Sequence, residues 1–424
     1  MYYNGTQWDN FTYAKICERF GAALSLYDIG HVAVDPANPD HFYAASYGTG
    51  LIEFRADGTA KRWNHDNSPL VSLLTNNLRY RYCRVDAIAF DADRNLWLTN
   101  MGDIATNIHV IDPQGGWHSF NLYSGTQRVV LNTVSKLLVD NRYPNYKWIA
   151  SARDAVGLIL LNDNGTPYNS SDDRVVVRQS FLDQDQKAPP FEKLCTMAQD
   201  HNGDLWLGTN EGIIVIDAAT DLFKSNSCRR LKISRHDGTN LADYLLGTEQ
   251  VNAIVFAGGN RIWIGTDASG VYLVHMVTKE GIYEPEILAH FTSANSPMPS
   301  DCVLSIALNE QNGEVYVGTA KGLVSYRGDA TLPSDDFNGA YIYPNPVRPN
   351  YEGTITVNGL MDNTTVYIAD AAGNVVCRTH SNGGTAVWDG RTPSGKKAHS
   401  GVYTVYCNTA DGQSHTVLKV LLMH

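Results

Sequence analysis

Several short motifs that identify common enzyme classes are missing from this sequence of 424 residues. It contains no HExxH zinc motif, no GxSxG nucleophile turn and no phosphate-binding P-loop. We therefore expect no catalytic residue and a role that is not enzymatic. The alternative is an enzyme whose site is assembled from dispersed loop residues, which short motifs do not reveal.

Cysteine is scarce, and the seven cysteines include no CxxC pair. This excludes a disulfide scaffold and the usual structural zinc sites, so we expect no cofactor. No run of about 18 apolar residues is present, so we expect no transmembrane segment. The first residues lack a basic and then apolar stretch, so a secretory signal is absent from the chain as given.

Positive charge is also scarce. Charged residues make up 18% of the chain, and the net charge is −11. A protein that binds nucleic acid needs a basic surface to neutralise phosphates, so nucleic acid is excluded as a general partner. The segment from Ala340 onward carries six Lys or Arg and five Asp or Glu, so the acidity belongs to the residues before it.

What the sequence does contain is a repeat. An aromatic residue followed by small and apolar residues recurs, most plainly in Asp200–Asp217, which reads DHNGDLWLGTNEGIIVID. Successive markers are 54, 51, 58, 57 and 53 residues apart, so six units are visible. We expect each marker aromatic to fill the space between neighbouring units. The markers are Tyr43, Trp97, Trp148, Trp206, Trp263 and Tyr316.

Each unit has the pattern of a four-stranded antiparallel blade. An apolar strand such as Val251–Phe256 comes first, then a polar turn, the marker strand, a glycine connection and a third strand. A more variable fourth strand follows, as in Gly116–Phe120 and Ile287–Phe291. Four strands per unit, repeated radially, predict an all-β β-propeller over residues 1–335, with six blades visible and seven as the alternative.

The ends of the repeat region suggest how the ring closes. The last unit supplies a third strand, Gly322–Arg327, but no fourth one. Gly5–Phe11 at the start looks like a fourth strand without a blade before it. We expect these two segments to pair, which would remove the open edge of the last sheet.

After a linker at Ser334–Gly339 the pattern changes to short alternating runs separated by turn residues. Six or seven strands in this length predict a small Ig-like β-sandwich over residues 336–424. Its two cysteines, Cys377 and Cys407, form a disulfide in one interpretation and stay buried free thiols in the other.

Two resemblances are specific. The WLGT repeats resemble the two-component-regulator propeller repeats of periplasmic sensors and surface proteins of Bacteroidota, and the tail resembles the type IX secretion sorting domain. The combination resembles the PorZ-like family of type IX secretion surface proteins, of which the chain would match the second propeller and the tail. The tail motif residues are Pro344, Asn345, Pro346, Asp389, Gly390, Gly401, Tyr403 and Lys419.

The resemblance implies a non-catalytic scaffold at the outer-membrane surface, of which this chain is a fragment or a shorter relative. Its implied partners are the sortase or other outer-membrane proteins of the type IX machinery and anionic lipopolysaccharide. The propeller would dock proteins, and the tail would serve for sorting or lipopolysaccharide binding. The alternatives are secreted cargo with a propeller that binds or processes polysaccharide and, third, the periplasmic sensor domain of a hybrid two-component system.

Candidate binding residues come from loops of the propeller, where cations stand beside aromatic rings or cluster in an acidic region. The polar turn at Asp200, Asn202 and Asp204 has oxygen ligands that suit Ca²⁺, although such turns more often serve the fold. The candidate residues are Arg79, Tyr80, Arg81 and Tyr82 in one group, and Arg229, Arg230, Lys232, Arg235 and His236 in the other.

Overall fold

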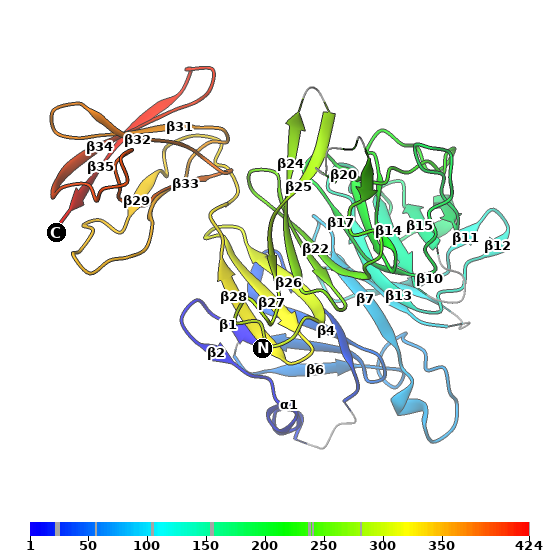
Figure 1. The fold of residues 1–424 in the computed structure, drawn as a ribbon. Helices are drawn as coiled ribbons and strands as arrows, with labels where there is room; N and C mark the ends of the chain where they lie inside the picture. The colour runs from blue at the N-terminus through cyan, green and yellow to red at the C-terminus, as the bar shows by residue number, and fades with distance from the viewer. Residues whose placement is uncertain are drawn as a thin grey trace. The chain divides into compact units, whose positions relative to one another are not determined.

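The computed structural model describes residues 1–21, 26–55, 57–102, 106–152, 157–235, 239, 241–279 and 282–423. The fold is all-β, and within the described residues α1 (Tyr13–Phe20) is the one α-helix (Figure 1). Thr12 accepts a hydrogen bond from the Lys15 amide at its start, and Gly21 ends it in the left-handed conformation. The chain divides into two compact units, Met1–Arg230 and Leu231–His424.

The first unit holds four propeller sheets whose strands follow one another in chain order. Neighbouring strands are antiparallel, as short connections require. The first three sheets have four strands: β3 (Ile29–Asp35), β4 (Asn38–Ser46), β5 (Gly50–Arg55) and β6 (Ala60–Trp63); β7 (Val85–Phe90), β8 (Leu96–Asn100), β9 (Ile108–Ile111) and β10 (Trp117–Phe120); and β13 (Val134–Val139), β14 (Tyr146–Ser151), β15 (Gly157–Asn162) and β16 (Arg174–Arg178).

The fourth sheet has three strands, β17 (Leu194–Gln199), β18 (Leu205–Thr209) and β19 (Gly212–Ile216). The outer edge of β19 is partly covered, because the backbones of Val215 and Arg229 exchange two hydrogen bonds. Smaller elements of this unit are β1 (Tyr2–Tyr3), β2 (Trp8–Asp9), β11 (Tyr123–Ser124), β12 (Gln127–Arg128) and the 3-10 helices η1 (Arg79–Arg81) and η2 (Ser170–Asp172).

The aromatic markers lie where the repeat predicts, on the second strand of each sheet. In the first unit Trp97 and Trp206 are among the largest fully buried side chains, and Trp148 is also buried. Trp97 belongs to a core that combines residues of the second and third sheets, including Val110, Leu137 and Ile159. The expectation that the markers fill the space between units is therefore confirmed in this unit.

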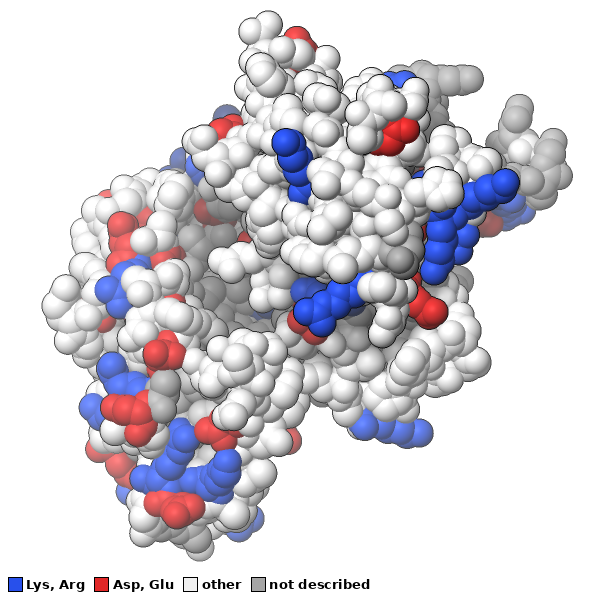
Figure 2. All heavy atoms as spheres, turned by 90° about the vertical axis from the view of Figure 1, so that its left-hand side faces the viewer, with Lys and Arg blue, Asp and Glu red and all other residues white. Residues whose placement is uncertain are grey.

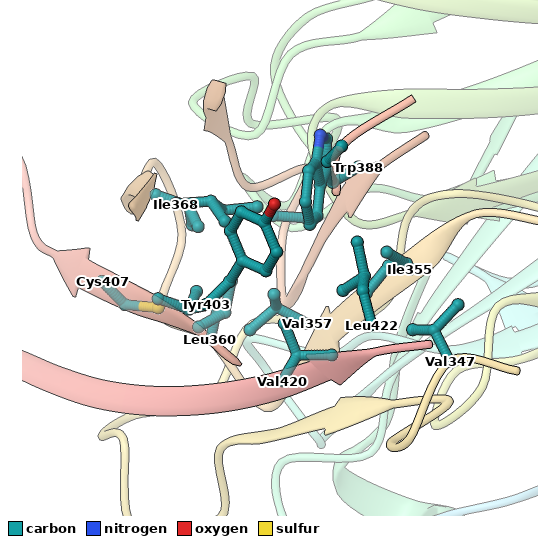
Figure 3. Packing of buried hydrophobic residues seen from close by; sticks show 14 residues of the cluster. Val347, Ile355, Val357, Leu360, Ile368, Trp388, Tyr403, Cys407, Val420 and Leu422 are labelled. Carbon is teal, nitrogen blue, oxygen red and sulfur yellow. The ribbon is translucent and has the colours of Figure 1, made fainter. Parts of the chain in front are cut away.

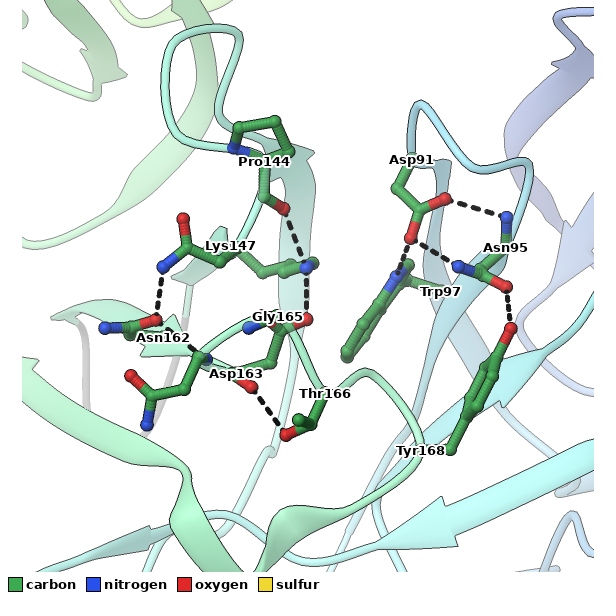
Figure 4. Close-up of polar contacts among 12 residues, drawn as sticks. Asp91, Asn95, Trp97, Pro144, Lys147, Asn162, Asp163, Gly165, Thr166 and Tyr168 are labelled. Atoms are coloured by element: carbon green, nitrogen blue, oxygen red, sulfur yellow. Dashed lines mark hydrogen bonds and ion pairs between the residues drawn. The ribbon is translucent and has the colours of Figure 1, made fainter.

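Hydrogen bonds from the indole N–H groups to aspartate carboxylates hold these tryptophans in place, and the sequence did not reveal them. One carboxylate oxygen of Asp91 accepts the Asn95 amide, and the other accepts the Trp97 indole N–H at 2.9 Å (Figure 4). Asp140 does the same for Trp148 at 2.9 Å and Asp200 for Trp206 at 3.3 Å, each with its other oxygen on amides of the turn. We call this arrangement the Asp–Trp lock.

The third sheet contains a buried ion pair. The side chains of Lys147 and Asp163 are each 2% exposed, and Lys147 Nζ lies 2.5 Å from Asp163 Oδ2. The ammonium also donates to the Pro144 carbonyl oxygen at 2.8 Å and lies 4.4 Å from the centre of the Trp97 ring (Figure 4). These contacts join β14 to the marker of the preceding sheet, and such a pair is costly to break because one charge would stay buried alone.

The second unit contains two more propeller sheets. One has four strands and buries Trp263 against Phe291 with ring centres 5.8 Å apart. The other has three strands among the described residues. The strands are β22 (Val251–Ala257), β23 (Arg261–Thr266), β24 (Val271–Lys279) and β25 (Ile282–Phe291); and β26 (Val303–Asn309), β27 (Glu314–Thr319) and β28 (Gly322–Arg327); a hairpin of β20 (Lys232–Ser234) and β21 (Ala242–Tyr244) precedes them.

The expected pairing of Gly5–Phe11 with the last sheet would join the two units, and it stays a prediction. Trp8 and Asp9 form β2, which pairs with Tyr2 and Tyr3 of β1 in a two-stranded hairpin. The side chain of Asn4 accepts the amides of Thr6 and Gln7 and so closes this local turn. A tight turn brings β1 and β2 together at a small loss of chain entropy.

The tail forms the expected Ig-like sandwich of two antiparallel sheets. Its core lies between them and includes Trp388, Tyr403 and Val420 (Figure 3). Cys377 and Cys407 are both free thiols, so the disulfide alternative is not formed. One sheet has β29 (Tyr341–Tyr343), β30 (Ile355–Asn358) and β33 (Thr385–Trp388); the other has β31 (Thr365–Ala369), β32 (Val375–His380), β34 (Gly401–Asn408) and β35 (His415–Leu422).

All six inner strands share one irregularity, a β-bulge near their first residue. The register with the next strand slips after Ile29, Val85, Val134, Leu194, Val251 and Val303. A bulge leaves a residue unpaired and re-aims its side chain. In β7 the skipped residues are Asp86 and Ala87, and the carboxylate of Asp86 accepts the Val134 amide of the next inner strand at 3.0 Å.

Candidate binding surfaces

The first candidate group lies on η1 and the residues beside it. Asn76 starts the turn by accepting the Leu78 amide, and the Ser72 hydroxyl donates to the Arg79 carbonyl oxygen. The Arg79 side chain is exposed and pairs with Asp66 at 3.1 Å. Short polar side chains that bond nearby backbone favour such turns.

The cations of this loop lie beside aromatic rings, as the sequence led us to expect. The Arg81 guanidinium lies 5.4 Å from the Tyr80 ring centre and 5.8 Å from that of Tyr27. The neighbouring Arg84 lies 5.1 Å from Tyr82 and 4.4 Å from Tyr47. Each guanidinium thus faces two rings within the distance at which cation–π attraction acts. A binding role for these residues stays a prediction.

The second candidate group is not a surplus of free positive charge. Arg229 pairs with Asp217 at 2.8 Å and Asp204 at 3.2 Å, and Arg235 pairs with Asp243 at 2.5 Å. Acidic and basic side chains are likewise interspersed on the face drawn in Figure 2. These two guanidinium groups are thus paired with carboxylates, and a binding role for them stays a prediction.

The remaining members of that group have separate surroundings. Arg230 belongs to the first unit, where its backbone amide donates to Gln184 and its carbonyl accepts from the same side chain. Lys232 lies in β20 of the second unit, 5.9 Å from the Tyr244 ring centre. His236 lies outside the described residues. A binding role for Arg230 and Lys232 stays a prediction.

The turn considered for Ca²⁺ uses its oxygens within the fold. Oδ1 of Asp200 accepts the amides of Asn202 and Asp204, and Oδ2 accepts the Trp206 indole. Burial raises the pKa of Asp200. The carboxylate of Asp204 accepts the Ala218 amide and Arg229. Within the described part of the chain, no group of three or more His, Cys, Asp or Glu is placed to hold a metal. These contacts support the structural alternative for this turn.

A charged cleft that the sequence did not single out lies between turns of the first two sheets. It has a volume of about 460 Å³. His41 lines it, with Nδ1 3.2 Å from Asp35 Oδ2 and Nε2 2.9 Å from Glu53 Oε1. The sequence feature that could have indicated this cleft is the high density of charged residues in these turns. We define the rim cleft by Asp35, His41, Glu53, Arg55, Lys61 and Arg94, which line it.

Ion pairs shape the rim cleft. Arg94 holds Asp35 with two hydrogen bonds of 3.0 and 2.7 Å, which lowers the pKa of Asp35 to about 2 against the opposing effect of burial. Arg94 adopts a left-handed backbone with φ of 65°. Gly203 occupies the corresponding place in the turn of the fourth sheet, also with positive φ. For an arginine this left-handed backbone conformation costs about 1 kcal/mol, and the hydrogen bonds between Arg94 and Asp35 offset that cost.

The tail motif residues mainly build the sandwich. The Asn345 side chain donates to the Lys419 carbonyl and accepts the Leu421 amide, which fastens the start of the tail to its last strand. Both prolines beside it, Pro344 and Pro346, follow cis peptide bonds. The Tyr403 hydroxyl donates to the His399 carbonyl, and its ring packs on Trp388.

The turn after Trp388 uses the remaining motif residues. Asp389 accepts the Arg391 amide, and Gly390 has a φ of 71°, which suits glycine. Gly401 opens β34, where Thr404 pairs with Lys419 of β35. This motif is thus explained by folding, and a sorting role for its residues stays a prediction.

Comparison with known proteins finds a family model that matches the tail and solved structures that are similar to the chain. The FlgD Ig-like domain family matches residues 350–413. No curated protein matches the chain. The solved structure of PorZ, an essential bacterial surface component of the type IX secretion system of Porphyromonas gingivalis, is similar over 100% of this chain, with 31% identity and a TM-score of 0.70. The chain spans 55% of the length of that PorZ chain.

Other solved structures are more distant. The extracellular domain of the putative one component system BT4673 from Bacteroides thetaiotaomicron is 15% identical, with a TM-score of 0.43 over 93% of this chain and 50% of its own. The β-propeller domain of Cps50 from Myceliophthora thermophila is 9% identical, with a TM-score of 0.43 over 92% of this chain and 97% of its own.

The sheet topology and the family match of the tail define the class of protein: a β-propeller followed by an Ig-like sandwich. Within that class, the similarity to PorZ confirms the resemblance to PorZ-like proteins that the sequence motifs indicated. Within the described residues, no helix is long and apolar enough to cross a membrane.

Proposed function

We propose that this chain is part of an exported surface component of the type IX secretion machinery and acts without catalysis. The observation that carries the proposal is the similarity to PorZ along the whole chain, at 31% identity. The Ig-like match in the tail supports the same assignment, since a propeller with such a tail is what the motifs predicted.

In this proposal the propeller loops dock protein partners, namely the sortase or other outer-membrane proteins of the machinery. The Arg–Tyr loop at Arg79–Tyr82 supports docking, because arginine and tyrosine are the residues most enriched at binding hot spots. The tail serves for sorting or for binding anionic lipopolysaccharide at the outer-membrane surface. Both roles are inferred from the resemblance of the tail motif.

The decisive experiment is the intact mass and terminal sequences of the mature protein recovered from the surface of the cells that produce it. A retained tail through Leu422 is expected for a machinery component. A chain that ends near Pro333 would instead make the protein cargo, whose sorting domain is removed on export.

Docking is tested by recovery of machinery proteins with the full chain. Replacing Arg79, Arg81, Arg229 and Arg230 by alanine should reduce recovery of the sortase, because cation–π and charge-assisted contacts are removed. Arg391→Ala, in a tail turn, is the matched control. Unchanged recovery with the four replacements would contradict the proposed docking face.

A further inference from the structure

The rim cleft is built from four turns of the first two sheets. Asp35 ends β3 and His41 lies near the start of β4, Arg55 and Lys61 flank the connection between β5 and β6, and residues 112–115 lie between β9 and β10. Arg94 comes from the turn between β7 and β8. A cavity of about 460 Å³ lies in the range that small ligands occupy.

The acidic side chains of the rim cleft have no oxygen left without a donor. Oδ1 of Asp35 accepts the Ala37 amide and Arg94 Nε, and Oδ2 faces Arg94 Nη2 and His41 Nδ1. Oε1 of Glu53 faces His41 and Arg55, and Oε2 accepts the Trp63 indole N–H at 3.2 Å.

A third carboxylate lines the same cavity and is also occupied. Oδ1 of Asp112 accepts the amides of Gln114 and Gly116, and Oδ2 lies 3.1 Å from His118 Nε2. The contact with His118 is the largest reason that the pKa of Asp112 is lowered, so this group stays ionised. The carboxylates of the rim cleft therefore offer few acceptor sites to a ligand.

The cations, in contrast, keep donors in reserve. Arg94 uses Nε and Nη2 on Asp35, and Arg55 uses Nη2 on Glu53, which leaves the other guanidinium N–H groups of both without a described acceptor. Their side chains are 44% and 50% exposed. Lys61 makes no ion pair within the described chain, and its Nζ lies 3.5 Å from the Trp63 ring centre.

A pocket with spare donors and occupied acceptors selects a ligand group that only accepts hydrogen bonds. Carboxylates and phosphates are such groups, whereas a neutral sugar hydroxyl also brings a donor that needs an acceptor. We propose that the rim cleft binds the oxyanion of a small polar molecule, a carboxylate or a phosphate, between Arg55, Lys61 and Arg94. This inference is independent of the secretion role proposed above.

Titration calorimetry of the full chain at low salt tests the proposal. The probes are glucuronate for a carboxylate, glucose 6-phosphate and inorganic phosphate for a phosphate, and glucose as the neutral counterpart. We expect at least one anion to bind and glucose not to bind. Added salt should weaken binding, because the cations are partly exposed. Binding should also change the fluorescence of Trp63, since the anion draws Lys61 from the ring.

The double variant Arg55→Gln, Lys61→Gln removes reserve donors and leaves the Arg94 pair with Asp35 intact. It should weaken anion binding about tenfold or more, as loss of charge-assisted bonds does. Lys224→Gln is the matched control, because Lys224 is an exposed lysine of the same unit outside the cleft. Thermal melts of all three proteins establish that they fold alike.

The outcomes separate clearly. Binding of glucuronate alone assigns a carboxylate ligand, and binding of the phosphates assigns a phosphate ligand. No anion binding at millimolar concentrations would overturn the proposal. Equal binding of glucose and glucuronate, or equal loss in Lys224→Gln, would also overturn it, because the recognition would not come from the reserve donors.

Discussion

The propeller sheets fall into three kinds, which differ in the residue before the marker strand and in the marker aromatic itself. In the second to fourth sheets an aspartate before the marker strand accepts the indole N–H of a tryptophan. In the first sheet Asp35 is present, but the marker is Tyr43. In the fifth, Trp263 is present, but Ala257 stands six residues before it, where Asp91 and Asp200 precede their tryptophans.

The difference indicates that the aspartate of this turn has two alternative uses: it forms the Asp–Trp lock in some sheets and helps to build the rim cleft in the first. Where no indole claims the carboxylate, Asp35 is free to bind Arg94 and His41, and these contacts make the cleft. Where no carboxylate is available, Trp263 packs on Phe291 and Tyr326 with ring centres 5.8 and 5.3 Å away. Where the marker has no indole N–H, the buried aspartate therefore binds side chains beyond its own turn.

The largest effect is expected from Trp97→Ala in the second sheet. Its side chain is fully buried, so the variant leaves a cavity and removes one of the donors to Asp91. We expect a loss of about 3 to 5 kcal/mol of unfolding free energy, measured by urea denaturation. Tyr123→Ala, at an exposed position, should change stability little; a similar loss in both would show that the lock has no special weight.

Removal of the acceptor alone should have a smaller effect. Asp91→Ala leaves the Trp97 indole and the Asn95 amide without their buried partner, at a loss of about 1 to 3 kcal/mol. Asp93→Ala in the same turn is the control, because Asp93 is exposed. Thermal melts that shift equally for both variants would assign the effect to turn composition instead.

The second and fifth sheets differ in the residue at the bulge, which is Asp86 in one and Asn252 in the other. Both side chains form a hydrogen bond with the backbone of the next inner strand. Burial raises the pKa of Asp86 to about 7, so the folded protein holds a proton that the unfolded chain has already lost above pH 4. Stability from this group is therefore present at low pH and lost as the pH rises towards 7.

Asp86→Asn copies the residue of the fifth sheet and removes that titration. We expect it to stabilise the protein at pH 8 relative to its effect at pH 4, by up to about 4 kcal/mol for a pKa raised to about 7. Denaturation at both pH values measures the difference. An equal effect at the two pH values would mean that the carboxyl group does not titrate between them.

The smallest effect is expected at the rim cleft. The pKa of Asp35 is lowered to about 2, so its stabilising charge is fully present above about pH 4 and is lost as the pH falls towards 2. Because Arg94 is partly exposed, screening limits the contribution to roughly 1 kcal/mol or less. An NMR titration should give a midpoint near 2 for Asp35 and a higher one in Arg94→Gln; identical midpoints would remove Arg94 as the cause.

Local patterns carried most of the fold prediction. The repeat placed Trp97, Trp206 and Trp263 on second strands, and the variable fourth strands appear as β10 and β25. In the tail, Thr365–Ala369 and Thr385–Trp388 are strands as expected. Alternation, turn residues and period are properties of neighbouring residues, so the sequence displays them directly.

Contacts between distant residues were the part that could not be predicted. A run of basic residues does not show that Arg229 reaches Asp204, 25 residues away. The rim cleft has the same origin, since Arg94 meets Asp35 across 59 residues. The Asp–Trp lock also escaped, because the aspartate precedes its tryptophan by six residues at Asp91 and eight at Asp140.

The bulge on every inner strand has a consequence for how such a chain can diversify. At the bulge the register of paired residues skips a position, so cross-strand pairing constrains the residue there less than it constrains the neighbouring residues. The five bulges that leave out one residue contain, in order, a glycine, a serine, a cysteine, an asparagine and a leucine: Gly30, Ser135, Cys195, Asn252 and Leu304. Gene duplication can thus copy the blade while one position in each copy is left to vary independently.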